Sequence, residues 1–162
     1  IFNLIDINSV KEMLLIQLDL AKEANNQNII RENIKSDIIL VPKIYDSDKD
    51  HIIMEYLDGY KFNDFINEFP NYDEECIALL YCCLCKMIQS KKIHGDFHGG
   101  NFYFRIEDEI LKIIVLDYGI ICDLNEIQSK HLLRSLNMKI SKAKRNEAFI
   151  NFIYSLDDKI NI

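Results

Sequence analysis

The segment His94-Gly95-Asp96-Phe97-His98-Gly99-Gly100-Asn101 constrains the fold of this chain more than any other. It follows a helix-like run, Asp73 to Lys92, and precedes two strand-like runs, Phe102 to Arg105 and Ile110 to Leu116. We therefore predict that the segment is a loop that joins a helix to a pair of strands. The chain as a whole is predicted to adopt an α+β fold.

The spacing of two polar residues in this loop indicates a chemistry. Asp96 and Asn101 are five places apart in a loop that is entered through His-Gly, which is the spacing of a kinase catalytic loop. In such a loop the carboxylate accepts the proton of the nucleophile and the amide holds a magnesium ion. Asp96 is thus the candidate base or positioning residue, and Asn101 is a candidate metal ligand.

The triplet Asp117-Tyr118-Gly119 strengthens this interpretation. It follows the second apolar run, and a short turn at Ile106 to Glu109 would pair the two runs as a hairpin. The hairpin would bring the carboxylate of Asp117 to face the first loop, as phosphoryl transfer requires. Asn101 and Asp117 offer hard oxygen ligands, which suit Mg²⁺. The pattern predicts a phosphotransferase or an ATPase.

Two histidines flank Asp96. We place His94 with Asp96 as a candidate catalytic residue that orients the loop through hydrogen bonds. His98 either contacts a phosphate or holds the turn. An alternative is a transition-metal site formed by His94, Asp96 and His98, but this site would leave Asn101 and Asp117 unexplained.

Composition narrows the class of protein. The 162 residues are enough for about one domain with a hydrophobic core. A net charge of −7 argues against a nucleic-acid surface, and no apolar run is long enough to predict a transmembrane segment. Five cysteines, three of them within Cys82 to Cys85, do not form a secreted disulfide pattern, so a reducing intracellular compartment is expected. Cys82 and Cys85 lack partners with zinc spacing and are predicted to be small buried thiols.

The rest of the chain is predicted to be mainly helical. Ser9-Val10-Lys11-Glu12 has a capping-box pattern, which predicts a helix that runs to near Asn33. Strands are predicted over Val41–Asp46 and His51–Tyr56, and Leu57-Asp58-Gly59 ends the second. Short helices are predicted over Phe62–Phe69 and Arg145–Tyr154. A longer helix capped by Asp73 is predicted to face inward with Ile77, Leu80, Leu84, Met87 and Ile88. Another, capped within Asp123–Asn125 and running to Met138, is predicted to face inward with Ile127, Leu132, Leu133 and Leu136.

Several segments, in order, resemble the UbiB family of atypical kinases. They are Gln17–Asn26, Val41–Tyr45, Ile53–Gly59, the loop His94–Asn101, Leu116–Gly119 and Asp123–Glu126. The resemblance implies a protein-kinase-like fold that binds ATP with Mg²⁺, and an association with coenzyme Q or other isoprenoid lipid metabolism. It also implies an ATPase or small-molecule kinase, whose phosphoryl acceptor is a small molecule or lipid rather than a protein.

The resemblance also implies roles for four residues outside the loop. Glu23 matches the helix glutamate that pairs with a strand lysine, and Asp19 matches the acid of a Glu-x-Asp motif whose glutamate is Gln17 here. Glu55 and Leu57 match positions that border the adenine. Phe97 and Gly99 replace two prolines of the family's loop, which makes this loop less rigid.

The same resemblance divides the chain into a partial kinase N-lobe, residues 1–57, and a C-lobe, residues 58–162. A phosphate-covering loop and a strand lysine should precede the first helix, and neither pattern is present, so we expect an N-terminally truncated copy. Two alternatives stay open. One is a small-molecule kinase of the aminoglycoside or choline kinase type, which shares the His-Gly-Asp loop. The other is a pseudokinase that serves as a binding module.

Overall fold

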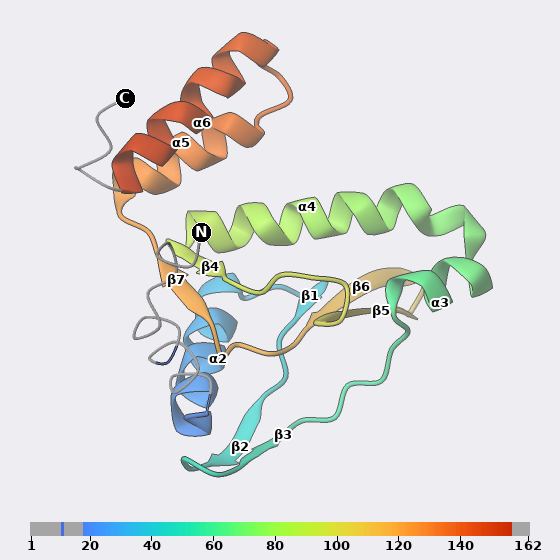
Figure 1. Ribbon diagram of the computed structural model, residues 1–162. Helices are drawn as coiled ribbons and strands as arrows, with labels where there is room; N and C mark the ends of the chain where they lie inside the picture. Colours follow the sequence, from blue (N-terminus) through green and yellow to red (C-terminus); the bar gives the residue numbers. More distant parts are fainter. Residues whose placement is uncertain (1–10, 12–17, 157–162) are drawn as a thin grey trace.

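A computed structural model describes residue 11 and residues 18–156 of the chain. The elements in chain order confirm the predicted mixture of helices and strands (Figure 1). They are α2 (Leu20–Ile34), β1 (Ile39–Leu40), β2 (Ile44–Ser47), β3 (Ile52–Met54), α3 (Phe62–Glu68), the short 3₁₀ helix η2 (Pro70–Tyr72), α4 (Asp73–Gln89), β4 (Lys92–His94), β5 (Phe102–Glu107), β6 (Ile110–Val115), β7 (Ile121–Asp123), α5 (Glu126–Leu136) and α6 (Lys142–Leu156).

Strand pairing fixes both ends of the loop His94–Asn101. Strands β5 and β6 form an antiparallel hairpin, and β1 pairs in parallel with the other edge of β6. Strand β4 pairs with β7, so that His94 lies opposite Ile121. The loop between β4 and β5 and the segment between β6 and β7 are therefore held next to each other at both ends. A separate hairpin joins β2 to β3.

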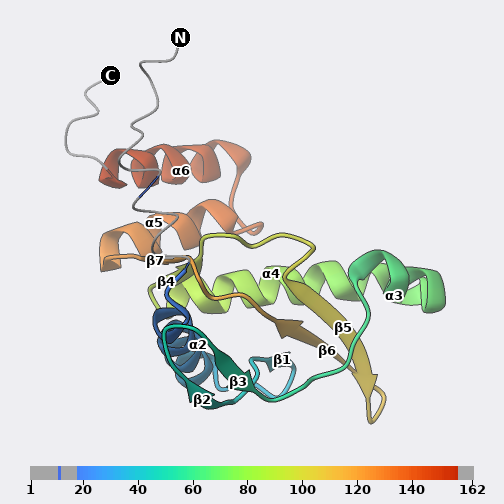
Figure 2. The same cartoon turned by 60° about the horizontal axis from the view of Figure 1, so that its bottom comes forward.

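The core lies between the β5–β6 hairpin and the long helix α4. In two views α4 lies between this hairpin on one side and the α5–α6 pair on the other (Figure 1, Figure 2). The cluster of fully buried side chains includes Phe65, Cys83, Met87, Phe104, Ile113 and Tyr118. Burial of large apolar side chains contributes roughly 1.5–3 kcal/mol each, so this cluster is the main support of the hairpin and of the loop beside it.

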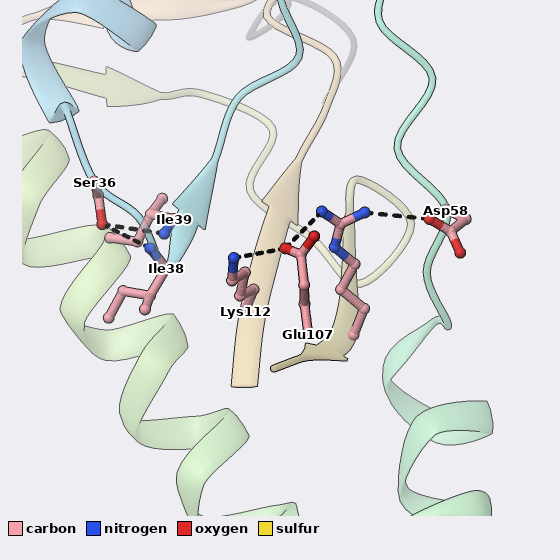
Figure 3. Close-up of polar contacts among 7 residues, drawn as sticks. Ser36, Ile38, Ile39, Asp58, Glu107 and Lys112 are labelled. Atoms are coloured by element: carbon pink, nitrogen blue, oxygen red, sulfur yellow. Dashed lines mark hydrogen bonds and ion pairs between the residues drawn. The ribbon is translucent and has the colours of Figure 1, made fainter. Parts of the chain in front are cut away.

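An ionic network ties the hairpin to the segment after β3. Arg105 Nη1 donates to Asp58 at 3.2 Å and Nη2 donates to Glu107 at 3.0 Å, while Lys112 also pairs with Glu107 (Figure 3). Nearby, Ser36 Oγ accepts from the backbone N–H groups of Ile38 and Ile39 and so orders the start of β1. These contacts join the segment around Asp58 to the strands that lead to the site.

The predicted first helix is wrong in its central part. The chain is not helical at Leu18 and Asp19, and α2 begins at Leu20. The reason is that the Asp19 side chain accepts a hydrogen bond from Lys22 N at 3.3 Å and caps the N-terminus of α2. The capping box at Ser9 falls outside the described residues, apart from Lys11.

The strand predictions need four corrections. The strand predicted from Val41 begins only at Ile44, because Pro42 has no N–H to donate. The two-residue strand β1 was not predicted. Strand β7 was not predicted either, and β4 begins at Lys92, where the sequence predicts the end of the preceding helix. Such short strands are defined by their partners more than by their own sequence.

The helix α4 is confirmed but its details differ. Asp73 is the first helical residue rather than the cap, which is Tyr72. Ile77 is exposed, and the buried face instead carries Cys76, Leu79 and Cys83. Burial raises the pKa of the Cys76 thiol to about 11 and that of Cys83 to about 12, so both stay protonated near neutral pH.

The other helices agree with the sequence more closely. Helices α3, α5 and α6 lie near their predicted positions, and Asn125 caps α5 through a reciprocal pair with Gln128. Ile127, predicted to point inward, is exposed. Cys82 and Cys85 are half-buried free thiols rather than fully buried ones. Over residues 18–156, no helix combines the length and the apolar character that crossing a membrane demands.

Candidate active site

The register of the β5–β6 hairpin places Asn101 beside Asp117. Phe102 pairs with Val115, and the N–H of Leu116 donates to the carbonyl of Asn101 at 2.8 Å. Asp117 follows Leu116 directly, so the loop that ends at Asn101 and the segment that begins at Asp117 leave the hairpin at the same end. The backbones of Asn101 and Asp117, the two predicted metal ligands, therefore lie near each other.

Asn101 also binds the part of the loop that carries Asp96. Its Nδ2 donates to the Asp96 carbonyl at 3.0 Å and lies 3.5 Å from the Asp96 carboxylate. Because the amide nitrogen faces Asp96, the amide oxygen is the atom left to bind a cation. The structure thus joins Asn101 to Asp96 directly, and the backbone bond from Leu116 places the start of the Asp117 segment next to Asn101.

His94 links the loop to the segment before Asp117. It is buried, its Nε2 lies 3.0 Å from the carbonyl of Leu116, and its Nδ1 lies 3.1 Å from the N–H of Asp96. A carbonyl accepts and an N–H donates, so these partners assign the proton to Nε2 of a neutral ring. Both ring nitrogens are used by the backbone. His94 therefore acts as a positioning residue.

His98 closes the turn between Asp96 and Asn101. Its Nδ1 accepts from the N–H of Gly100 at 2.9 Å, and its Nε2 lies 3.3 Å from the Asp96 carboxylate. These are the contacts of a residue that holds the turn and orients the carboxylate. The described residues contain no group of three or more His, Cys, Asp or Glu side chains that could hold a metal ion, which gives the transition-metal alternative no support.

Glu23 of α2 lies near Asp117. A Cβ built on Gly119 would lie 3.5 Å from Asp117 Oδ1 and 3.8 Å from Glu23 Oε2, so the two carboxylates converge on this glycine. Burial raises the pKa of Glu23, the negative charge of Asp117 raises it further, and a hydrogen bond from the backbone of Tyr118 lowers it. Two acids this close attract a cation.

The backbone of Asp117 is held in a rare conformation. Its φ angle is 61°, in the left-handed region, which aspartate tolerates better than most residues. The neighbouring Tyr118 is fully buried, and its hydroxyl donates to the carbonyl of Val115 at 3.1 Å. The anchored Tyr118 ring thus fixes the strained residue, a situation common at functional sites.

Asn26 is a contributor to the site that the sequence did not single out. Its Nδ2 donates to the carbonyl of Tyr118 at 2.9 Å, which ties α2 to the Asp117 segment. Asn26 follows Glu23 by three residues, and residues at this spacing share one face of a helix. That spacing was the signal that could have identified it.

Three of the predicted site residues, Asp19, Glu55 and Leu57, have other contacts in the structure. Asp19 is exposed and caps α2. Glu55 accepts a hydrogen bond from Lys43 N at 3.1 Å, and Glu55 and Leu57 line a cavity of about 520 Å³ between the end of α2, β1 and Arg105. Among the described residues, no hydrogen bond joins these three to Asp96, Asn101 or Asp117. Their nucleotide-binding roles stay predictions.

Gly95 is a site where a single methyl group should disturb the loop. Its N–H donates to the carbonyl of Ile120 at 2.8 Å, and a Cβ on Gly95 would lie 2.4 Å from Ile120 Cγ2. We expect Gly95→Ala to lower the free energy of unfolding by about 1–3 kcal/mol, because the packed neighbours must move. Thermal denaturation measures this. The control is Gly99→Ala, where a Cβ meets nothing within 4 Å. Equal melting temperatures for the two variants would contradict the prediction.

Glu23 should make stability depend on pH. Its pKa is raised in the folded state, so the fold prefers the protonated form, and the free energy of unfolding falls as pH rises through the ordinary glutamate range. Glu23→Gln removes this loss. Without metal, we expect the variant to melt higher than the wild type at pH 7, with a smaller difference near pH 4. A lower melting temperature for the variant at pH 7 would show that Glu23 is stabilised by a partner.

A comparison with protein families decides the affiliation of the chain. The model of the ABC1 atypical kinase-like domain matches residues 4–149. The chain belongs to this family. The family assignment confirms the predicted resemblance to atypical kinases at the level of the family.

A comparison with solved structures shows the fold of this ABC1 domain. The complex of Rv3197 with erythromycin from Mycobacterium tuberculosis is 19% identical in sequence and superimposes with a TM-score of 0.64. The alignment covers 94% of this chain and 38% of that one, so the chain spans about two fifths of the length of the solved protein. No curated protein matches the chain significantly.

Proposed function

We propose that this ABC1 domain carries the catalytic residues of an ATP- and Mg²⁺-dependent phosphotransferase or ATPase. The observation that carries the proposal is the hydrogen bond from Leu116 N to Asn101 O, at 2.8 Å, within the hairpin register. It joins the end of the Asp96 loop to the start of the Asp117 segment. We infer from this contact that a carboxylate for the nucleophile and two oxygen ligands for a cation are within reach of one another.

The donor atoms fit the proposed ion. Mg²⁺ prefers oxygen ligands, and the amide oxygen of Asn101 and the exposed carboxylate of Asp117 are of this type. Burial raises the pKa of Glu23, the negative charge of Asp117 raises it further, and this nearby negative charge is a further reason for a cation to bind here. When bound, Mg²⁺ would neutralise charge on the nucleotide phosphates.

The residues of the chain would divide the remaining tasks. Asp96 orients the hydroxyl or water that attacks and accepts its proton, while His98 holds the Asp96 carboxylate in place. His94 fixes the loop against the Asp117 segment. Glu23, on α2, would orient a lysine from outside the described residues. We propose a small molecule or lipid as the acceptor, and the family resemblance favours isoprenoid or coenzyme Q metabolism.

The experiment that tests the proposal is a thermal-shift titration of the full-length protein with ATP, with and without Mg²⁺. A ligand that binds only the folded state stabilises it, by about 2.7 kcal/mol at a concentration of 100 times Kd. We expect a shift with ATP and Mg²⁺ together that is larger than the shift with either alone. No shift with both would contradict the proposal, and a shift without any turnover would favour the pseudokinase alternative.

A further inference from the structure

A second cavity, of about 410 Å³, lies beside the Asp96 loop. Its walls come from α3, α4 and the start of β5, and its lining surface is mostly apolar. Phe62, Leu80 and Phe102 supply the apolar surface, and Lys61 and Asp64 supply one charge of each sign. The volume falls in the range of small-molecule sites, roughly 300–1,000 Å³.

The loop itself forms one wall of this cavity. Gly99, which lines it, follows Asp96 by three residues. Phe102 packs on Phe97, with ring centroids 5.3 Å apart, and Phe97 is the residue next to Asp96. A Cβ on Gly99 would meet nothing within 4 Å, so the loop leaves open space on its surface. A molecule in the cavity would therefore contact the loop that carries Asp96.

We propose that this cavity binds the apolar body of the phosphoryl acceptor, an alcohol whose hydroxyl reaches Asp96. The apolar lining favours a hydrocarbon or aromatic body, and the balanced charges of Lys61 and Asp64 favour a neutral molecule. The inference rests on the proposed function. In the transfer, the hydroxyl oxygen bonds to the γ-phosphorus of ATP, the bond from that phosphorus to ADP breaks, and Asp96 takes up the hydroxyl proton.

Octanol is a suitable probe, and methyl octyl ether is its partner without a hydroxyl. In the full-length protein we expect calorimetry to show saturable binding of both, with the negative heat-capacity change of apolar burial. With ATP and Mg²⁺, mass spectrometry should detect octyl phosphate from octanol and no phosphate ester from the ether. Octanol binding should persist in the presence of ATP, because the side chains that line the cavity differ from Asp96, Asn101 and Asp117, which are proposed to serve ATP and Mg²⁺.

Two substitutions fill the cavity from different walls, Leu80→Phe from α4 and Gly99→Leu from the loop. Each should weaken octanol binding at least about tenfold, because a few methylene groups decide affinity in an apolar pocket. Leu80→Phe should keep the thermal shift with ATP and Mg²⁺. Asn67→Leu is the matched control, since Asn67 is exposed on α3 and does not line the cavity.

The octanol experiments test the cavity as the acceptor site, and the thermal shift with ATP and Mg²⁺ tests the proposed function. If octanol does not bind, is displaced by ATP, or binds both filled variants as tightly as the wild type, the cavity is not the acceptor site. The same conclusion follows if octanol binds but no octyl phosphate forms while ATP turnover is measurable. If instead ATP with Mg²⁺ produces no thermal shift in the wild type, the proposed function fails, whatever octanol does.

Discussion

Asp117→Asn should abolish Mg²⁺-dependent binding and turnover of ATP in the full-length protein. The substitution removes the charged ligand proposed for the cation and leaves the side chain the same size. Asparagine also tolerates the φ angle of 61° at this position and can still accept from the N–H of Gly119. We expect turnover to fall by about 100-fold or more, the scale of losing one preorganised electrostatic group.

The backbone at Asp108 provides a matched control for this experiment. Asp108 has a φ angle of 52°, is exposed, and lies in the turn at the far end of the β5–β6 hairpin. Asp108→Asn therefore makes the same chemical change in a similar backbone conformation, away from the site, and should leave turnover unchanged. Retention of Mg²⁺-dependent hydrolysis by Asp117→Asn would remove Asp117 from the metal site.

Asp96→Asn should separate catalysis from nucleotide binding. Asp96 is placed to take the proton of the nucleophile, and an amide cannot do this. We expect kcat to fall by about 10²–10⁴-fold, the usual contribution of a positioned acid or base, while the thermal shift with ATP and Mg²⁺ stays close to that of the wild type. Single-turnover kinetics and the thermal-shift titration measure the two effects on the same samples.

Comparing kcat, the melting temperature and nucleotide binding of Asp96→Asn distinguishes a catalytic role of Asp96 from a structural one. Asp96 has contacts with His98 and Asn101, so its substitution could disturb the turn. A structural defect would lower the melting temperature and weaken nucleotide binding together with kcat. We expect instead that kcat falls while the melting temperature and nucleotide binding stay close to those of the wild type. Normal turnover in Asp96→Asn would show that another group accepts the proton.

The sequence predicted the hairpin beside the candidate site better than the short strands around it. The spacing of Asn101 and Asp117, with one hairpin between them, was sufficient to predict that the two segments leave the hairpin at the same end. This worked because a tight hairpin fixes its own register, and that register decides which residues leave the same end. The loop-orienting role of His94 was predicted, and holding the turn was one of the two roles predicted for His98, whereas their individual partners were not predictable, since these depend on atoms brought together by the fold.

The errors of prediction have a common physical cause. Strands β1, β4 and β7 have only two or three residues each and exist because a partner strand lies beside them. Helix α2 begins after Asp19 because the Asp19 side chain binds the backbone N–H of Lys22, a contact that competes with a continuous helix. The spacing of apolar residues does not show which of the two forms. Ile77 and Ile127 were placed inward because periodicity locates a face only to within one residue.

The central claim is that Asn101 and Asp117 hold a divalent cation beside Asp96. Its most direct test is a crystal structure of the full-length protein with Mn²⁺ and a non-hydrolysable ATP analogue, in which anomalous scattering locates the metal. We predict Mn²⁺ at about 2.0–2.2 Å from the amide oxygen of Asn101 and from a carboxylate oxygen of Asp117. Mn²⁺ bound elsewhere, or a nucleotide bound with no metal at these two residues, would contradict the account.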